Sequence, residues 1–151
     1  MPKYFTPEAL EKFKKELDQL ENVERKKIAE KIKYAASFGD LTENAAYQEA
    51  KDSQGFLERK ISELKEIISQ AKVLNKKEDN KIQIGSSVLL LPDSKEKMEI
   101  QIVESEEADP FSGKVSHKSS LGAALLGRKK GDKVKIKTPE AVTEYQILSI
   151  K

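Results

Sequence analysis

The stretch Gly39-Asp-Leu-Thr-Glu-Asn44 separates two long segments in which apolar residues recur at helical spacing. In both segments the steps between apolar positions are mostly three and four residues, which is the spacing of a heptad seam. Each seam needs a partner, so two such helices on either side of a short break should fold back as an antiparallel hairpin with residues 39–44 at its tip. The expected seam positions are Leu10, Phe13, Leu17, Leu20, Ile28, Ile32 and Ala35, then Ala50, Gln54, Leu57, Ile61, Leu64, Ile68 and Ala71.

Two local signals refine the first helix. Thr6 followed by Pro7 is typical of a helix start, with Thr6 as N-cap and Pro7 at the first helical position. The step from Leu20 to Ile28 is one residue longer than a heptad. It predicts a stutter in the seam.

The chain changes character after Asn80, where glycines and prolines punctuate short β-branched runs. We expect strands at residues 86–91, 96–104, 113–117, 133–137 and 144–150, forming a small antiparallel sheet with one helix near residues 119–127. The apolar-free residues 75–80 favour a linker. The expected fold class is α+β, with a coiled-coil hairpin at 1–75, a linker at 76–82 and a sheet domain at 83–151.

Composition excludes several classes of protein. The 151 residues are 36% charged and only 6% aromatic, which is too little apolar material for one thick core around a deep catalytic pocket. A net charge of +2 lacks the basic excess of a protein that coats bare nucleic acid. The absence of Cys and the single His exclude thiolate and multi-histidine metal sites. With no apolar run of about 18 residues, we expect a cytoplasmic protein without membrane contact.

Asp40 and Glu43 place two carboxylates three residues apart at the predicted tip. Neighbouring carboxylates repel unless they share a cation, and Mg²⁺ takes one or two protein carboxylates and completes its shell from water and phosphates. The alternative is structural: Asp40 or Thr42 caps the second helix, Glu43 lies in its first turn and Gly39 ends the first helix. The two interpretations are compatible.

The tip motif continues through Tyr47 and is followed by Ala50-Lys51, Gln54-Gly-Phe56 and, far downstream, Ala123-Ala-Leu-Leu-Gly127 and Gly131-Asp132. Over essentially the whole chain these motifs resemble the bacterial Gre family of transcript cleavage factors, in particular its GreA class. The resemblance implies a coiled-coil hairpin that enters the secondary channel of RNA polymerase. It also implies a C-terminal domain similar to FK506-binding proteins that docks at the channel rim.

The same resemblance implies roles for individual residues. Asp40 and Glu43 would act in trans at the polymerase active centre, sharing a Mg²⁺ that the factor alone does not hold stably. The polymerase, rather than this chain, would then hydrolyse the 3′ end of backtracked nascent RNA. RNA-proximal positions would be Asn44, Tyr47 and Lys51, and polymerase-docking positions would be Ser119, Ser120 and Leu121.

Some of these assignments have structural alternatives. Tyr47 also continues the apolar seam, and lysines such as Lys51 often only solvate an exposed helix. The chain departs from the family pattern at Ala36, where an Arg is frequent, and at Ser120, where a Pro is common.

Three other functions fit parts of the sequence. A Gre-like inhibitor would occupy the channel without promoting cleavage, but the acids at 40 and 43 favour the stimulatory form. A peptidyl-prolyl isomerase needs an aromatic-lined pocket, and only Phe111 and Tyr145 are aromatic after Phe56. A plain coiled-coil interaction module would not need the tip acids.

Overall fold

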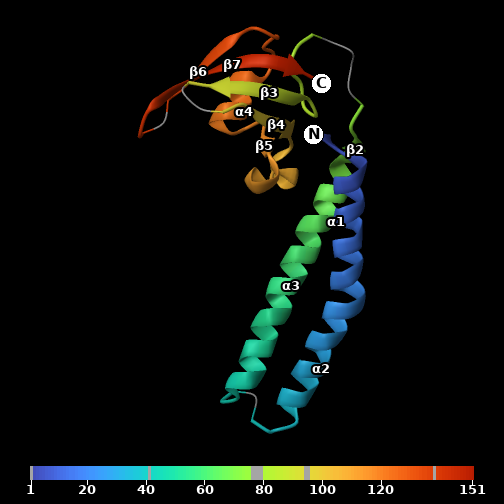
Figure 1. The fold of residues 1–151 in the computed structure, drawn as a ribbon. Coiled ribbons are helices and arrows are strands. Elements are labelled where there is room, and N and C mark those ends of the chain that lie inside the picture. The colour runs from blue at the N-terminus through green and yellow to red at the C-terminus, as the bar shows by residue number, and fades with distance from the viewer. Residues whose placement is uncertain (1, 41, 76–79, 94–95, 138) are drawn as a thin grey trace. The chain divides into compact units, whose positions relative to one another are not determined.

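The computed structural model describes residues 2–40, 42–75, 80–93, 96–137 and 139–151. Leu41 and most of the expected linker lie outside this part of the chain. Contacts divide the chain into a helical unit, Glu8–Ala71, and a sheet unit formed by Pro2–Pro7 together with Lys72–Lys151 (Figure 1). No helix in the described ranges is both long enough and apolar enough to cross a membrane.

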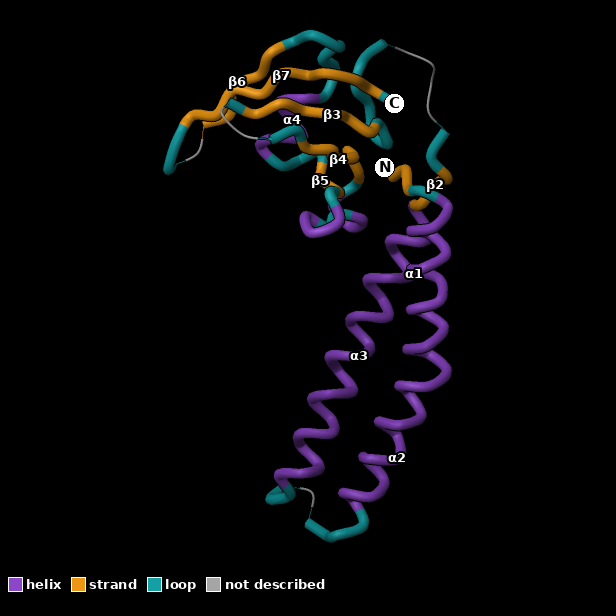
Figure 2. The backbone as a smooth tube through the Cα atoms, viewed as in Figure 1, coloured by secondary structure: helices purple, strands orange, loops and turns teal. Residues whose placement is uncertain are grey.

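The helical unit is the expected hairpin. One arm is formed by α1 (Pro7–Gln19), the π-helical turn η1 (Leu20–Glu24) and α2 (Arg25–Ala36), and the other arm is α3 (Ala45–Gln70). The two arms run side by side in opposite directions (Figure 2). The predicted seam is confirmed, because its central residues form one buried cluster: Leu20, Leu57, Ile61 and Leu64, with Phe13, Leu17 and Ile28 packed against them.

The predicted stutter is resolved by η1. A π turn holds about one residue more than an α turn, so Leu20 and Ile28 both reach the buried cluster although they are eight residues apart. Gln19 and Arg25, at its ends, keep α-helical dihedrals. The helix therefore absorbs the extra residue without breaking.

The ends of the hairpin lead into two short strands, β1 (Lys3–Phe5) and β2 (Ala71–Val73), which pair with each other. Thr6 precedes α1 as predicted, and its hydroxyl donates to Glu107 Oε2 at 2.9 Å while its backbone N–H donates to Oε1 at 3.2 Å. Lys3 forms an ion pair with Glu106. These contacts group Pro2–Pro7 with the sheet unit, whereas the sequence placed them with the hairpin.

The main sheet has the order β5-β4-β3-β7-β6. Its strands lie where the sequence predicted them: β3 (Ser87–Pro92), β4 (Met98–Val103), β5 (Lys114–Ser116), β6 (Lys133–Lys137) and β7 (Val142–Ile150). The expectation of a wholly antiparallel sheet was wrong at one pair, because β4 and β5 run parallel. Two short 3₁₀ turns, η2 (Ser105–Glu107) and η3 (Pro110–Ser112), carry the chain back along β4 as far as Gln101. There β5 begins beside β4 and runs in the same direction.

The core of the sheet unit lies between the sheet and α4 (Ser120–Leu125), the predicted helix. Gly122 makes this packing possible, because a Cβ at that position would lie 2.0 Å from the carbonyl oxygen of Ser116. The buried core residues are Ile82, Val88, Leu90, Ile100, Ile102, Leu125, Val134 and Ile147.

Replacing Ile61 should destabilise the hairpin strongly. The side chain is 2% exposed at the centre of the seam, and truncating a buried Ile to Ala costs about 2–5 kcal/mol. Urea unfolding of Ile61→Ala, followed by the helical circular dichroism signal, should show this loss. Phe56→Ala on the exposed side of α3 is the control, and an equal loss in both variants would contradict the assigned seam.

Candidate functional site

The tip begins where α2 ends. The backbone N–H of Ser37 donates to the carbonyls of Lys33 and Tyr34 at 3.2 Å, and that of Gly39 donates to Ala36 at 3.3 Å. Gly39 has φ +115°, a conformation that side chains disfavour. The first helix ends at Ala36 with Ser37 as its C-cap, so Gly39 lies in the turn that follows and, contrary to the prediction, does not itself stop the helix.

Asn44 begins the second arm. Its Oδ1 accepts the backbone N–H of Tyr47 at 3.0 Å as the N-cap of α3, and its Nδ2 donates to the carbonyl of Ala35 at 2.6 Å. One side chain therefore caps α3 and ties it to the end of α2. The alternative in which Asp40 or Thr42 caps this helix was wrong, and Glu43 precedes the cap instead of lying in the first turn. Asn is among the strongest N-cap residues, so the sequence did carry this signal.

Asp40 is held by a local turn. Its Oδ1 accepts the backbone N–H of Thr42 at 3.0 Å and the Thr42 hydroxyl at 2.7 Å. These bonds, the hydroxyl first, lower the pKa of Asp40 below its ordinary value because they favour the charged carboxylate. Asp40 is therefore an exposed, oriented anion at neutral pH.

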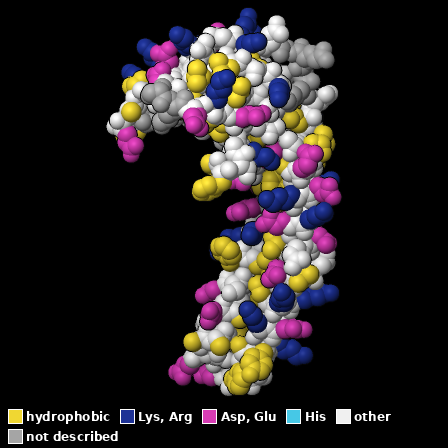
Figure 3. Space-filling view, viewed as in Figure 1, with side chains coloured by type: hydrophobic (Ala, Val, Ile, Leu, Met, Phe, Trp, Pro, Cys, Tyr) yellow, Lys and Arg dark blue, Asp and Glu magenta, His cyan; other side chains and the backbone are white. Residues whose placement is uncertain are grey.

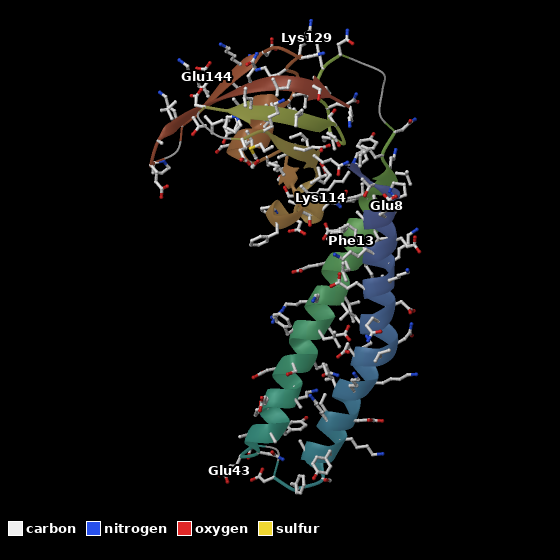
Figure 4. All side chains as sticks on the ribbon, in the orientation of Figure 1. Glu8, Phe13, Glu43, Lys114, Lys129 and Glu144 are labelled. Carbon is white, nitrogen blue, oxygen red and sulfur yellow. The ribbon has the colours of Figure 1, made fainter. Side chains whose placement is uncertain are left out.

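Glu43 is exposed at the end of the hairpin and points away from both helices (Figure 4). Acidic and hydrophobic side chains lie next to each other there (Figure 3). Within the described residues, no hydrogen bond or ion pair holds the Glu43 carboxylate, and no three His, Asp or Glu side chains gather as a metal site. Two exposed hard-oxygen ligands match the one or two protein carboxylates that Mg²⁺ usually takes. Asp40 and Glu43 are therefore the residues of the tip that could serve as Mg²⁺ ligands.

The positions expected near RNA follow the tip along α3. The Asn44 side chain caps α3 and donates to the Ala35 carbonyl, and Tyr47 is half-buried. Lys51 is exposed, and its Nζ donates to Gln54 Oε1 at 3.3 Å. The structure therefore leaves Lys51 as the most accessible of the three.

The positions expected to dock on polymerase lie at the start of α4. Ser119 is its N-cap: the hydroxyl accepts from the Gly122 N–H at 3.1 Å and donates to the Ser116 carbonyl at 2.6 Å. Leu121 packs against the sheet core. Ser120 is the exposed member of the three.

Two aromatic residues beside the tip had no role predicted from the sequence. Tyr34 and Phe38 are 70% and 68% exposed, and their rings meet edge to face with centroids 4.9 Å apart. Tyr34 lies on α2 away from the buried seam, and Phe38 lies in the turn that follows this helix. Two aromatics four residues apart and outside the predicted seam were the signal that could have revealed them.

Comparison with known proteins identifies the family to which the chain belongs. The description "Transcription elongation factor, N-terminal" matches residues 3–73, and "Transcription elongation factor, GreA/GreB, C-term" matches residues 76–151. The chain belongs to the GreA/GreB family. It is 47% identical over 149 residues to transcription elongation factor GreA of Thermosipho africanus, covering 98% of this chain and 96% of that protein. It is 40% identical to GreA of Clostridium acetobutylicum, covering 97% and 94%.

Solved structures of GreA/GreB relatives also match. GreA factor homolog 1 (Gfh1) of Thermus thermophilus is 25% identical, with a TM-score of 0.46 over 100% of this chain and 99% of that one. The GreA/GreB factor of Nitrosomonas europaea is 23% identical, with a TM-score of 0.44 over 60% and 78%.

Removing the Thr42 hydroxyl should raise the pKa of Asp40. In Thr42→Val the backbone bond to the carboxylate remains, but the larger cause of the lowered pKa is lost. Carboxyl NMR titration should show the Asp40 midpoint moving up toward its ordinary value. Ser37→Ala removes a tip hydroxyl that donates to the Tyr34 carbonyl, so it should leave that midpoint in place. An unchanged midpoint in Thr42→Val would contradict the turn.

Replacing Asn44 should loosen the tip. Asn44→Ala loses the cap and the bridge to Ala35, and a lost N-cap alone costs about 1 kcal/mol. Amide hydrogen exchange at Tyr47 should quicken about fivefold or more. Asn44→Asp keeps a cap acceptor but loses the Nδ2 donor, so it should retain most protection at Tyr47. Equal protection in Asn44→Ala and the unmodified protein would contradict the assigned cap.

Proposed function

We propose that this chain is a transcript cleavage factor that inserts its hairpin tip into the secondary channel of bacterial RNA polymerase. There it stimulates the polymerase's own Mg²⁺-dependent cleavage of backtracked nascent RNA and so rescues arrested complexes. The observation that carries the proposal is the pair of exposed carboxylates, Asp40 and Glu43, at the end of a long two-helix rod. Membership of the GreA/GreB family supports it.

The rod has the dimensions for this task. The 26 residues of α3 span about 39 Å at a rise of about 1.5 Å per residue. The seam along its centre makes the two arms one packed body. A carboxylate at its end can therefore be delivered into a deep, narrow site that a loop alone would not reach.

The chemistry requires little of this chain beyond two oriented anions. In two-metal phosphoryl hydrolysis, the bound ions activate the attacking water and stabilise charge on the leaving oxygen. Asp40 is ionised and held by Thr42, so its second carboxylate oxygen is available as a ligand. Glu43 extends beyond the cap of α3 and supplies another ligand or accepts a proton from a positioned water.

The chain is accordingly an activator and not an enzyme. Asp40 and Glu43 are two ligands of a site whose remaining ligands come from the polymerase and the RNA phosphates. Lys51, exposed along α3, is placed to attract the extruded RNA backbone. Ser120, exposed at the start of α4, is the docking position of the sheet unit that is free of a capping or core role.

The double variant Asp40→Asn, Glu43→Gln tests the proposal on backtracked elongation complexes. Cleavage stimulated by the variant should fall by about 100-fold or more, the scale of losing metal ligands or a general base. Its affinity for polymerase should be unchanged, because both side chains lie outside the seam and the cap.

A matched control removes two acids elsewhere on the same hairpin. Asp52→Asn with Glu63→Gln changes two exposed residues of α3 by the same charge and should cleave like the unmodified protein. If the tip variant binds and stimulates cleavage at the normal rate, the tip acids have no such role. If the unmodified protein binds polymerase without accelerating cleavage, the chain is a channel-occupying inhibitor instead.

A further inference from the structure

We propose that the groove beside Tyr34 and Phe38 holds an unpaired RNA base, so that the tip grips the RNA end by stacking. The occupant is the 3′-terminal segment of the RNA that the tip acids act upon. This inference rests on the proposed function and names how that site retains its substrate.

The groove lies between the two arms next to the tip. Its buried floor is made by the small side chains of Ala35 and Ala50, which leave space where the rest of the seam has Leu and Ile. Its volume is about 280 Å³, close to the lower limit of about 300 Å³ for small-molecule sites. The lining residues are Lys31, Tyr34, Ala35, Phe38, Ala46, Glu49, Ala50 and Ser53.

The two aromatic rings form one wall of this groove. They are more than two-thirds exposed, and in an edge-to-face pair one ring presents an uncovered face. Stacking on such faces is how proteins hold single-stranded nucleic acid regardless of base identity. Ser53 and Glu49 on the opposite wall offer a hydroxyl and a carboxylate for the polar edge of a base.

α2, which carries Tyr34 and leads to Phe38, is a basic helix. α2 contains five basic residues and one acidic residue, whereas α3 contains four basic and five acidic residues. Arg25 is paired with Glu58, and Lys27 with Glu24. In the described part of the chain no ion pair engages Lys31, which lines the groove, or Lys33. Lys31 and Glu49 are the one basic and the one acidic residue of the lining, so the positive charge that attracts a polyanion comes from the α2 arm and not from the groove itself.

The position of the groove suits the chemistry at the tip. Phe38 precedes Asp40 by two residues, so their Cα atoms are at most about 7 Å apart. A base stacked on Phe38 would bring its own phosphate, or the next one, near the two acids. An Arg is frequent in the family at the position of Ala36. The aromatic pair offers a contact with RNA that does not depend on this positive charge.

The test uses backtracked elongation complexes whose RNA ends in the fluorescent base 2-aminopurine. Stacking on Tyr34 or Phe38 should quench this base when the unmodified protein binds. Tyr34→Leu with Phe38→Leu keeps apolar bulk but removes both rings, so it should abolish the quench. It should also lower the cleavage rate at limiting factor about tenfold, within the range for one lost base stack.

Two further variants separate stacking from folding and from general surface effects. Tyr34→Phe with Phe38→Tyr preserves both rings and should restore quench and rate. Phe56→Leu removes another exposed ring of the hairpin, one that lies under the Arg59 guanidinium, and should change neither.

The outcomes distinguish this inference from the function on which it rests. If the unmodified protein accelerates cleavage but the double Leu variant matches it in quench and rate, the stacking site is refuted. If the double Leu variant instead loses affinity for polymerase that carries no RNA, the rings contact protein and the inference is overturned. If the unmodified protein fails to accelerate cleavage, the proposed function falls, and this inference with it.

Discussion

The apolar seam between the two arms of the hairpin is the constraint on which the other features depend. Neither arm can bury its stripe alone, so Leu20 on one arm and Leu57, Ile61 and Leu64 on the other are packed into one cluster. The one-residue misfit in the first arm would move its second half out of register with the partner. The π turn at Leu20–Glu24 removes that misfit and lets the rod continue to the tip.

The seam thins toward the tip, where alanines replace the larger apolar residues. The buried side chains are smaller there, and Asn44 also joins the arms because it caps α3 and donates to the Ala35 carbonyl. Because Asn44 caps α3 and joins it to α2, Asp40 and Glu43 beside it remain exposed. Thr42 orients Asp40, and Glu43 stands outside the helix. The same alanines open the groove beside the aromatic pair.

Periodicity in the sequence predicted the hairpin, its tip and the strands of the sheet unit, because these follow from local spacing and turn chemistry. The bond between Thr6 and Glu107 joins residues 101 apart, and no local pattern encodes it. The parallel pairing of β4 and β5 depends on the path of two 3₁₀ turns, which hydrophobic alternation does not specify.

At the tip, too, some features could be predicted from the sequence and others could not. The acids at 40 and 43 were identified as candidate ligands from the sequence, and they are exposed in the structure. The choice of cap among Asp40, Thr42 and Asn44 depended on where α3 begins, which sequence spacing leaves uncertain by a few residues. The position of Tyr34 and Phe38 outside the seam could be read from the sequence, but their ring contact and the groove beside them could not.

The central claim is that Asp40 and Glu43 complete a Mg²⁺ site whose other ligands belong to the polymerase and the RNA. The most direct measurement is the rate of RNA cleavage in a stalled elongation complex as a function of Mg²⁺ concentration, with and without saturating factor. The factor should lower the Mg²⁺ concentration that gives half-maximal cleavage, because two added carboxylates strengthen binding of the more weakly held ion. An unchanged Mg²⁺ midpoint, with only the maximal rate altered or with no acceleration at all, would contradict it.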